Sequence, residues 1–265
     1  MALKRSKNGL FLMLSLDRQN ELREQYRQMN PDWRPATELY ADLVRAQLRA
    51  QLRAQLRPSG RVLDIGCGRG GLVEQLEHPL SQMVGIDPDW QSLREHRLTL
   101  PRAVAFSDQI PFVAASFDVV FASWLLEHLE RPSDTFCEIG RVLKPGGSFV
   151  FITPNGRHPL SALNRGLGRF ARLQGRIVER FYGRVGADTF PTYYRANDIA
   201  TLRQLCQPNG LHFAELHAIP DPTYLAFTPM LFRLMSWFEG WLPEERGLHL
   251  VGVVRRRTEG VLRLP

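Results

Sequence analysis

The stretch that decides the fold reads Val62-Leu63-Asp64-Ile65-Gly66-Cys67-Gly68-Arg69-Gly70-Gly71. A short apolar run that ends in glycines is typical of a buried strand, and the helical spacing of residues 72–76 predicts a helix behind the turn. Glycine accepts positive φ and lets a ligand approach the backbone, while a helix start offers N–H groups and a positive dipole end. The stretch therefore predicts a small-molecule site of the nucleotide-binding kind.

The glycines alone do not say which nucleotide binds. Gly66, Gly68 and Gly71 fit the dinucleotide spacing G-x-G-x-x-G, whereas Gly70 in place of Gly71 gives G-x-G-x-G. Asp64 separates the two, because a carboxylate before the turn repels a pyrophosphate but suits a cation such as the amino group and sulfonium of S-adenosylmethionine. A second role stays open, in which Asp64 accepts hydrogen bonds from N–H groups of the glycine loop itself.

Length and composition set the outer limits. The 265 residues suit one large α/β domain with additions or two small ones, and a hydrophobic content of 44% is ordinary for a globular protein. Three scattered cysteines form neither a disulfide framework nor a metal cluster, which favours the reducing cytoplasm, and the histidines lack the spacing of metal ligands. The net charge of +7 allows an anionic partner such as phosphate, nucleic acid or a lipid surface.

Residues 1–57 are predicted to form an N-terminal helical extension. The apolar run at 9–16 is too short to span a bilayer and has no signal-peptide cleavage site, so we expect it to pack on the domain. Residues 38–57 predict one long helix, in which leucine and arginine repeat every four residues. We expect its basic stripe to be a solvated helix face, with contact to nucleic acid or membrane as the alternative.

Carboxylates follow two further strands. A strand at 82–86 ends at Asp87, about twenty positions after the glycine turn, where an acidic residue can bind both hydroxyls of an adenosine ribose. The alternative is that Asp87 caps the next helix. A strand at 102–106 precedes Asp108, whose carboxylate can accept a hydrogen bond from an adenine amino group.

Strands alternate with helices through residue 153, which predicts a parallel sheet covered on both faces, with ligands at the carboxyl ends of its strands. A fourth strand at 119–122 leads into Ser123, and a fifth covers 148–153. This topology brings Asp64, Asp87, Asp108 and Ser123 to one edge of the sheet.

Five further motifs follow the glycine stretch in order: Gly85-Ile86-Asp87, Asp108-Gln109-Ile110-Pro111-Phe112, Ser116-Phe117-Asp118-Val119-Val120, Leu126-Glu127-His128-Leu129 and Arg141-Val142-Leu143-Lys144-Pro145-Gly146-Gly147. This series, over about residues 58 to 153, resembles a class I S-adenosylmethionine-dependent methyltransferase with a type 11 domain. It is most similar to the small-molecule branch typified by the ubiquinone and menaquinone methyltransferases.

The resemblance implies an α/β fold with a Rossmann-like, seven-stranded, mostly parallel sheet, helices on both faces and an antiparallel last strand. Residues 211–219 and 248–254 suit the last two strands. The cofactor would be S-adenosylmethionine, with Asp64 at the glycine loop or the amino group. The remaining cofactor-binding residues would be Gly66, Gly68 and Gly70 at the methionine portion, Asp87 at the ribose, Asp108 with Gln109 at the adenine, and Ser123 at the same edge.

The methyltransferase domain is expected to span residues 58–258, with cap insertions at about 155–190 and 221–246. The first is rich in arginine and predicts a basic amphipathic helix. This helix could be an ordinary cap helix, a lid over the acceptor or a surface that contacts anionic lipid, and the three roles stay open. The second is apolar and aromatic, but its proline and charged residues argue against a transmembrane helix. Burial, a dimer contact and an interfacial membrane helix stay open, and the two insertions together favour a hydrophobic or lipid-linked acceptor.

The implied reaction is direct transfer of the methyl group to a small-molecule acceptor, by O- or C-methylation, with S-adenosylhomocysteine as the product. Because the methyl group is already activated, alignment supplies much of the catalysis. His128 follows the fourth strand and is the predicted base; the alternative is that it only holds its loop by hydrogen bonds. Tyr193 and Tyr194 are predicted to bind the acceptor, although aromatic residues there are also typical of a core.

Three other functions stay open. The basic charge favours a nucleic-acid methyltransferase, but the chain lacks an Asn/Asp-Pro-Pro-Tyr/Phe motif after the fourth strand and any separate RNA-binding module. A protein that binds cofactor or partner without catalysis is the second, and an NAD-dependent oxidoreductase, disfavoured by Asp64, is the third. We expect a cytoplasmic enzyme with peripheral membrane contact as a further option, and the sequence does not indicate the oligomeric state.

Overall fold

The computed structural model describes residues 16–55, 60–168, 191–224 and 228–258. Its centre is a seven-stranded sheet in the order β3-β2-β1-β4-β5-β7-β6. Strands β1 to β5 pair in parallel, and β7 runs antiparallel to both β5 and β6. This confirms the predicted Rossmann-like sheet. The strands are β1 (Val62–Ile65), β2 (Met83–Asp87), β3 (Arg102–Val104), β4 (Phe117–Ser123), β5 (Leu143–Pro154), β6 (Leu211–Ile219) and β7 (His249–Arg256).

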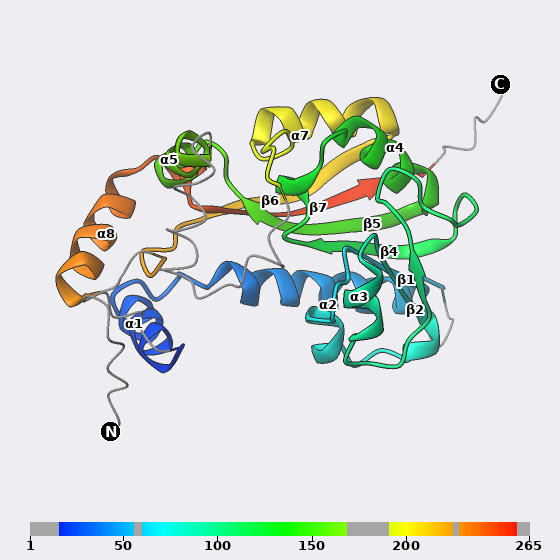
Figure 1. Ribbon diagram of the computed structural model, residues 1–265, viewed down its shortest axis with the longest axis horizontal. Coiled ribbons are helices and arrows are strands. Elements are labelled where there is room, and N and C mark those ends of the chain that lie inside the picture. Colours follow the sequence, from blue (N-terminus) through cyan, green and yellow to red (C-terminus); the bar gives the residue numbers. More distant parts are fainter. Residues whose placement is uncertain (1–15, 56–59, 169–190, 225–227, 259–265) are drawn as a thin grey trace.

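Helices cover both faces of the sheet. Figure 1 shows α2 (Ala36–Gln55) and α3 (Trp90–Arg94) below it, and α4 (Pro132–Val142) and α7 (Ile199–Cys206) above it. Each face has its own apolar core because side chains alternate along a strand. In β4, for example, Phe121 packs in the core under α2, whereas Ala122 packs in the core under α4 and α7. The two-layer burial explains why the central strands read as continuous apolar runs.

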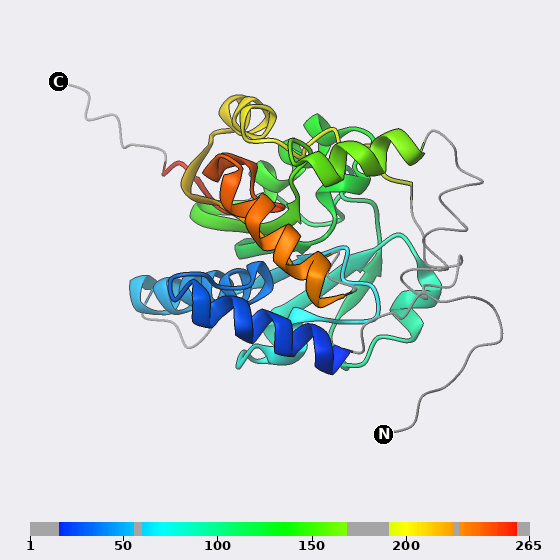
Figure 2. The same cartoon turned by 90° about the vertical axis from the view of Figure 1, so that its left-hand side faces the viewer.

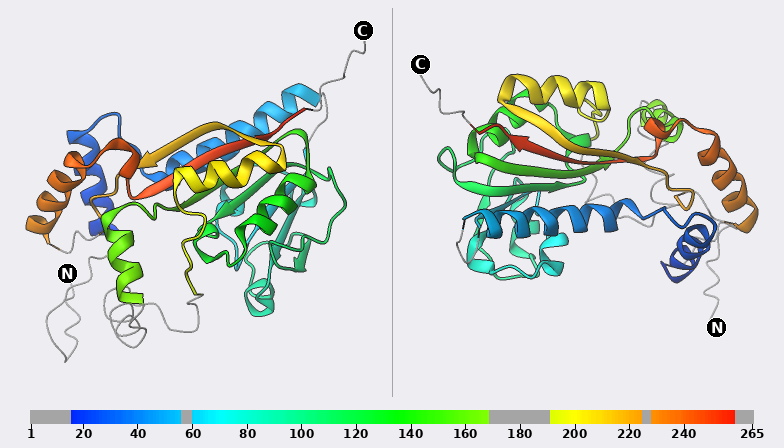
Figure 3. Two further views of the ribbon diagram at one scale, coloured as in Figure 1. Left: turned by 90° about the horizontal axis from the view of Figure 1, so that it is seen from above. Right: turned by 180° about the vertical axis from the view of Figure 1, so that it is seen from behind.

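Three helices gather at one end of the molecule, beyond the ends of β5 and β6: α1 (Leu16–Met29), α5 (Pro159–Gly168) and α8 (Pro229–Trp241). Figures 2 and 3 show α1 and α8 side by side. Leu22 and Tyr26 of α1 share an apolar cluster with Phe232 of α8 and with Trp33, which lies between α1 and α2. The indole N–H of Trp33 also donates to the Pro220 carbonyl at 2.8 Å. The N-terminal segment and the second insertion therefore form one cap.

The predicted helix behind the glycine turn is wrong. Leu72–Gln75 form a single 3-10 turn, so no α-helix presents its N-terminus to the glycines. Pro79 follows within eight residues, and because a proline disfavours the helical conformation of the residue before it, too few residues are left for an α-helix. Any recognition of a ligand by the turn must come from its backbone and from neighbouring side chains.

Several predicted features lie wholly or partly outside the described residues. These are most of the apolar run at 9–16 and the greater part of the arginine-rich insertion, of which the structure describes α5. Within the described ranges, no helix is long and apolar enough to cross a membrane.

Candidate active site

A cavity of about 570 Å³ lies where the carboxyl ends of β1 and β4 meet the beginning of α2. Small-molecule sites typically enclose roughly 300–1,000 Å³, so this volume suits a cofactor. Its wall has three parts: the end of β1 with the glycine turn, the end of β4, and one face of α2. The lining residues are Asp64, Gly66, Cys67, Gly68, Gly70, Gly71, Leu72 and Gln75 from the first, Ser123 and Trp124 from the second, and Arg34, Thr37, Glu38, Tyr40, Ala41, Asp42 and Arg45 from the third.

Two glycines leave the backbone of the turn open to this cavity. Gly68 has a φ of +49° and Gly71 a φ of +148°, conformations that L side chains rarely adopt. A β-carbon built on either residue would meet no other heavy atom within 4 Å. Neighbouring protein atoms therefore leave the space next to these two glycines open, and a ligand can approach the backbone there.

Asp87 holds the glycine turn in place. Its Oδ2 accepts a hydrogen bond from the N–H of Gly68 at 2.9 Å, and its Oδ1 accepts one from the N–H of Asp89 at 2.8 Å. Asp89, rather than Asp87, caps α3, because its carboxylate accepts the N–H groups of Gln91 and Ser92. The helix-cap alternative for Asp87 is therefore wrong, and so is the alternative in which Asp64 holds the loop. Asp87 lies at the strand end behind the turn rather than in the cavity wall.

Asp64 is a buried carboxyl group that lines the cavity. Burial, with a contribution from the charge of Asp87, raises the pKa of Asp64 to about 8. Among the described residues, none donates a hydrogen bond to this carboxyl group or forms an ion pair with it. A cation in the cavity would stabilise the ionised form, because an opposite charge nearby favours it. Asp64 thus fits the amino group and sulfonium of S-adenosylmethionine.

The third part of the wall contains residues that the sequence did not mark. Ser123 Oγ donates to the hydroxyl of Tyr40 on α2 at 3.0 Å. Burial, with a smaller contribution from Asp64, raises the pKa of Tyr40 well above its usual value, so its hydroxyl stays neutral. Trp124 follows β4 with a left-handed φ of +55°, and its N–H donates to the Ile152 carbonyl at 3.0 Å. No local pattern could have found Tyr40, because it lies on another element far from the glycine turn.

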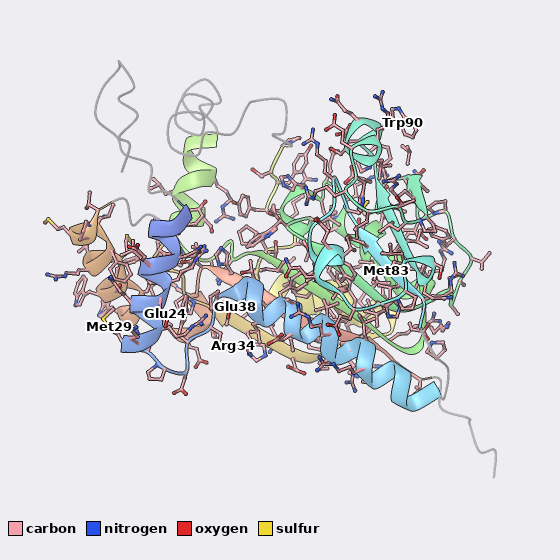
Figure 4. All side chains as sticks on the ribbon, turned by 90° about the horizontal axis from the view of Figure 1, so that it is seen from below. Glu24, Met29, Arg34, Glu38, Met83 and Trp90 are labelled. Atoms are coloured by element: carbon pink, nitrogen blue, oxygen red, sulfur yellow. The ribbon has the colours of Figure 1, made fainter. Side chains whose placement is uncertain are left out.

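Positively and negatively charged side chains line the α2 side of the cavity. Arg34 and Arg45 pair with Asp42, and their hydrogen bonds, chiefly that from Arg34, lower the pKa of the Asp42 carboxyl. Figure 4 shows Arg34 and Glu38 near the junction of α1 and α2, where Arg27 of α1 binds Glu38 at 2.9 Å. Exposed ion pairs contribute only about 0–1 kcal/mol, so these arginines can also reach the carboxylate of an amino-acid ligand.

Besides Asp87, five predicted site residues lie outside the wall of this cavity: Asp108, Gln109, His128, Tyr193 and Tyr194. Asp108, predicted at the adenine, forms an ion pair with Arg131 at 2.7 Å, and Gln109 is exposed. These two residues follow β3, on the β2 side of the glycine turn, in keeping with the order of the strands. Their contact with adenine stays a prediction.

His128, Tyr193 and Tyr194 form a second group next to the end of β4. The N–H groups of Tyr193 and Tyr194 donate to the Glu127 carbonyl at 2.7 and 3.2 Å. His128 Nδ1 lies 2.9 Å from the Pro191 carbonyl, and because a carbonyl only accepts, Nδ1 carries the proton. These contacts tie residues 191–194 to the loop after β4. They fit the loop-holding alternative for His128, and its role as a base stays a prediction.

Comparisons with known proteins identify the family of this chain. A family model described as a methyltransferase domain matches residues 63–151. The ubiquinone biosynthesis O-methyltransferase of Bordetella pertussis is 30% identical over 186 residues, which cover 66% of this chain and 74% of the relative. The enzyme of the same name from Hahella chejuensis is 31% identical over 172 residues, with 60% and 69% covered.

Solved structures support the fold. That of geranyl diphosphate C-methyltransferase from Streptomyces coelicolor A3(2) superposes with a TM-score of 0.56 at 15% identity, over 91% of this chain and 84% of that chain. A sarcosine dimethylglycine methyltransferase structure from Galdieria sulphuraria gives a TM-score of 0.54 at 16% identity, over 82% and 85%.

Sheet order, glycine turn and strand-end carboxylates define a nucleotide-type site on a Rossmann-like fold. The chain belongs to the class I S-adenosylmethionine-dependent methyltransferases. It uses S-adenosylmethionine to methylate a small-molecule acceptor. This sets aside the NAD-dependent oxidoreductase and the non-catalytic binding protein that the sequence left open.

Proposed function

We propose that the acceptor is a hydrophobic or lipid-linked small molecule, methylated on oxygen or carbon, rather than a nucleic acid. The two relatives described above are named O-methyltransferases of ubiquinone biosynthesis, which favours oxygen. The cap offers further support, because an exposed apolar stripe on α8 gives a lipophilic molecule a surface to contact. Its members are Met230, Leu234, Trp237 and Trp241, exposed by 82, 53, 67 and 74%.

The observation that carries the donor half of the proposal is the buried Asp64, which has no hydrogen-bond donor among the described residues and lies beside the open backbone of Gly68 and Gly71. In this proposal Asp64 receives the amino group, Arg34 and Arg45 the carboxylate, and Asp87 the ribose. S-adenosylmethionine supplies a methyl group already activated on a positively charged sulfur. The neutral Tyr40–Ser123 pair is part of the wall on the α2 side, and alignment of the acceptor supplies much of the rate.

A hydroxyl acceptor also needs a base for its proton. Two imidazoles stand near the carboxyl ends of the central strands: His128 after β4, and His249 at the start of β7 beside the end of β5. A neutral imidazole suits this task because a ring nitrogen without a proton can accept one.

We further propose that the enzyme works in the cytoplasm and touches the membrane surface through α8. The three cysteines are free, which fits a reducing compartment. The stripe on α8 carries two tryptophans at helical spacing, and tryptophan favours the membrane–water interface. Arg233 is exposed on the same helix and the chain carries a net charge of +7, so anionic lipid is the complementary surface.

Calorimetric titration with S-adenosylmethionine, S-adenosylhomocysteine and NAD tests the donor site. We expect the first two to bind and NAD not to. Asp87→Ala should weaken S-adenosylhomocysteine by at least about 10-fold, because it removes the ribose contact and the hydrogen bond to Gly68. Asp89→Ala is the matched control: it loses the cap of α3, worth about 1 kcal/mol, but should bind within about 3-fold of wild type.

Binding of NAD alone, or equal affinities in both variants, would contradict the donor site. An acceptor screen with lipophilic phenols, quinones and glycolipids then tests the acceptor class. Methylation of RNA but of none of these compounds would overturn the proposed acceptor.

A further inference from the structure

A second group of titratable side chains lies outside the cofactor cavity, where α5, α8 and β7 meet. His158, just before α5, and Glu239 of α8 are fully buried, with 3.2 Å between Nε2 and Oε1. His249, the first residue of β7, is also buried, and Asp221 and His158 both act on its ionisation. His249 pairs with Pro154 at the carboxyl end of β5. This group therefore lies at the same edge of the sheet as the cofactor cavity.

His249 lies between the His158–Glu239 pair and the cofactor cavity. Its ring meets the ring of Trp124 edge-on, with 5.1 Å between centroids and 77° between planes, and Trp124 lines the cavity. Two residues further along β7, Val251 packs in the core shared with α2, and because side chains alternate along a strand, His249 faces the same side. The imidazole therefore borders the cavity wall on the side covered by α2.

Aromatic rings frame the imidazole. The ring of Tyr224 meets that of His249 edge-on, with 6.5 Å between centroids and 75° between planes. Trp124 and Tyr224 are 37% and 41% exposed, whereas His249 is 8% exposed. His249 is thus flanked by two partly exposed aromatic rings, which give a flat or lipophilic acceptor a surface to contact beside the imidazole.

The imidazole of His249 also has no hydrogen-bond partner among the described residues. Within the described part of the chain it makes no hydrogen bond, whereas the nearby His158 accepts one on Nδ1 from the N–H of Leu160 at 3.1 Å. Buried polar groups are nearly always hydrogen-bonded. A donor that arrives with a ligand would satisfy this one.

We propose that His249 binds the hydroxyl group of the acceptor and takes its proton during methyl transfer. The inference rests on the proposed function, since it requires an acceptor that carries a hydroxyl group. As the O–H bond breaks, the proton moves to a ring nitrogen of His249. An electron pair on the oxygen forms the new bond to the methyl carbon, and the carbon–sulfur bond breaks with its pair left on sulfur. His128 then has the loop-holding role that its contact with Pro191 supports.

The groups around His249 act on its ionisation in opposite senses. Burial lowers the pKa of His249 to about 4, opposed by Asp221 and reinforced by His158 and by Arg23 of α1. His249 is therefore neutral near pH 7, the form that accepts a proton. The imidazolium that forms during the reaction is stabilised by Asp221, whose Oδ1 is held by the N–H of Thr223 at 3.0 Å.

The experiment compares His249→Asn with the matched variant His128→Asn, using 4-nitrocatechol as the acceptor because its absorption band reports ionisation of its hydroxyl group. The first readout is the spectrum of 4-nitrocatechol bound to the complex with S-adenosylhomocysteine, and the second is turnover with S-adenosylmethionine. Calorimetric affinity for S-adenosylhomocysteine, expected within about 3-fold of wild type in both variants, shows that the fold and the donor site persist.

We expect wild type and His128→Asn to shift the bound spectrum toward the ionised form, and His249→Asn to abolish this shift and lower kcat by about 100-fold or more. An unchanged shift and turnover in His249→Asn, or loss of the shift in His128→Asn alone, would overturn the inference while leaving the proposed function standing. A wild-type enzyme that neither binds nor methylates 4-nitrocatechol, but methylates an acceptor without a hydroxyl group, would overturn both the O-methylation proposal and the role of His249.

Discussion

The carboxyl groups of Asp64 and Asp87, at the ends of neighbouring strands, differ in their hydrogen bonds. Asp87 is fixed by two backbone N–H groups and orders the glycine turn. Asp64, one strand away, is buried without such bonds, and the proximity of Asp87 disfavours its ionisation further. Ionisation of Asp64 is therefore unfavourable in the free enzyme, and a cationic ligand would favour it.

This arrangement predicts a pH-dependent stability. The pKa of Asp64 is about 8 in the folded protein and 3.8 as a reference, so the folded state keeps a proton that the unfolded state releases. Stability should fall as pH rises through this window. Asp64→Asn should remove the loss and be more stable than wild type at about pH 8 by roughly 3–5 kcal/mol, and by little near about pH 4. Urea unfolding of both proteins across this range measures the difference.

Cofactor binding offers a second readout of the same group. Because the amino group of the ligand favours ionised Asp64, binding of S-adenosylhomocysteine near pH 7 should release about one proton. Calorimetry in buffers with different ionisation enthalpies measures this release, and Asp64→Asn should show none. A stability difference that is independent of pH, or equal proton release by both proteins, would contradict the assignment.

At the scale of elements, α8 is attached by a buried polar contact as well as by apolar packing. Phe232 joins the cluster with α1, while Glu239 faces His158 with both side chains almost wholly inaccessible. Neither carboxylate oxygen of Glu239 has a hydrogen-bond partner of good geometry among the described residues. The pair is thus an electrostatic restraint on this helix, since losing one partner leaves the other buried alone.

We expect Glu239→Ala and His158→Ala each to lower the free energy of unfolding by about 3–5 kcal/mol, with the double variant well short of the sum. A double-mutant cycle followed by urea unfolding measures the coupling. Arg27→Ala, which breaks the exposed pair with Glu38, is the control and should cost less than about 1 kcal/mol. Additive effects of the two buried substitutions would show that the pair does not hold α8.

At the scale of the whole molecule, the cap and the far end of the sheet differ in their surfaces. The cap presents the apolar stripe of α8, and Met29 of α1 is also 60% exposed there. Figure 4 shows Met29 at the α1–α8 end and Trp90 at the opposite end of the molecule. A membrane-facing orientation would place the cap on the lipid and keep the sheet in water.

Vesicle sedimentation tests this orientation. Trp237→Ser combined with Trp241→Ser should lower partitioning onto phosphatidylglycerol-containing vesicles by about 10-fold or more, because two interfacial aromatic anchors are lost. Trp90→Ser removes a tryptophan that is 63% exposed at the other end and should partition like wild type. Equal losses in both proteins, or binding that ignores lipid charge and salt, would contradict the proposed contact.

The sequence by itself determined the sheet, the glycine turn and the strand-end positions of Asp64, Asp87 and Ser123, because apolar periodicity and glycine punctuation are local signals. It did not determine the conformation after Gly71, where one turn replaced a helix, or which aspartate holds the loop. Only the tertiary structure placed Tyr40 against Ser123 and His249 against Trp124. These contacts join elements far apart in the chain, and they follow from how helices pack on the sheet, which no short stretch encodes.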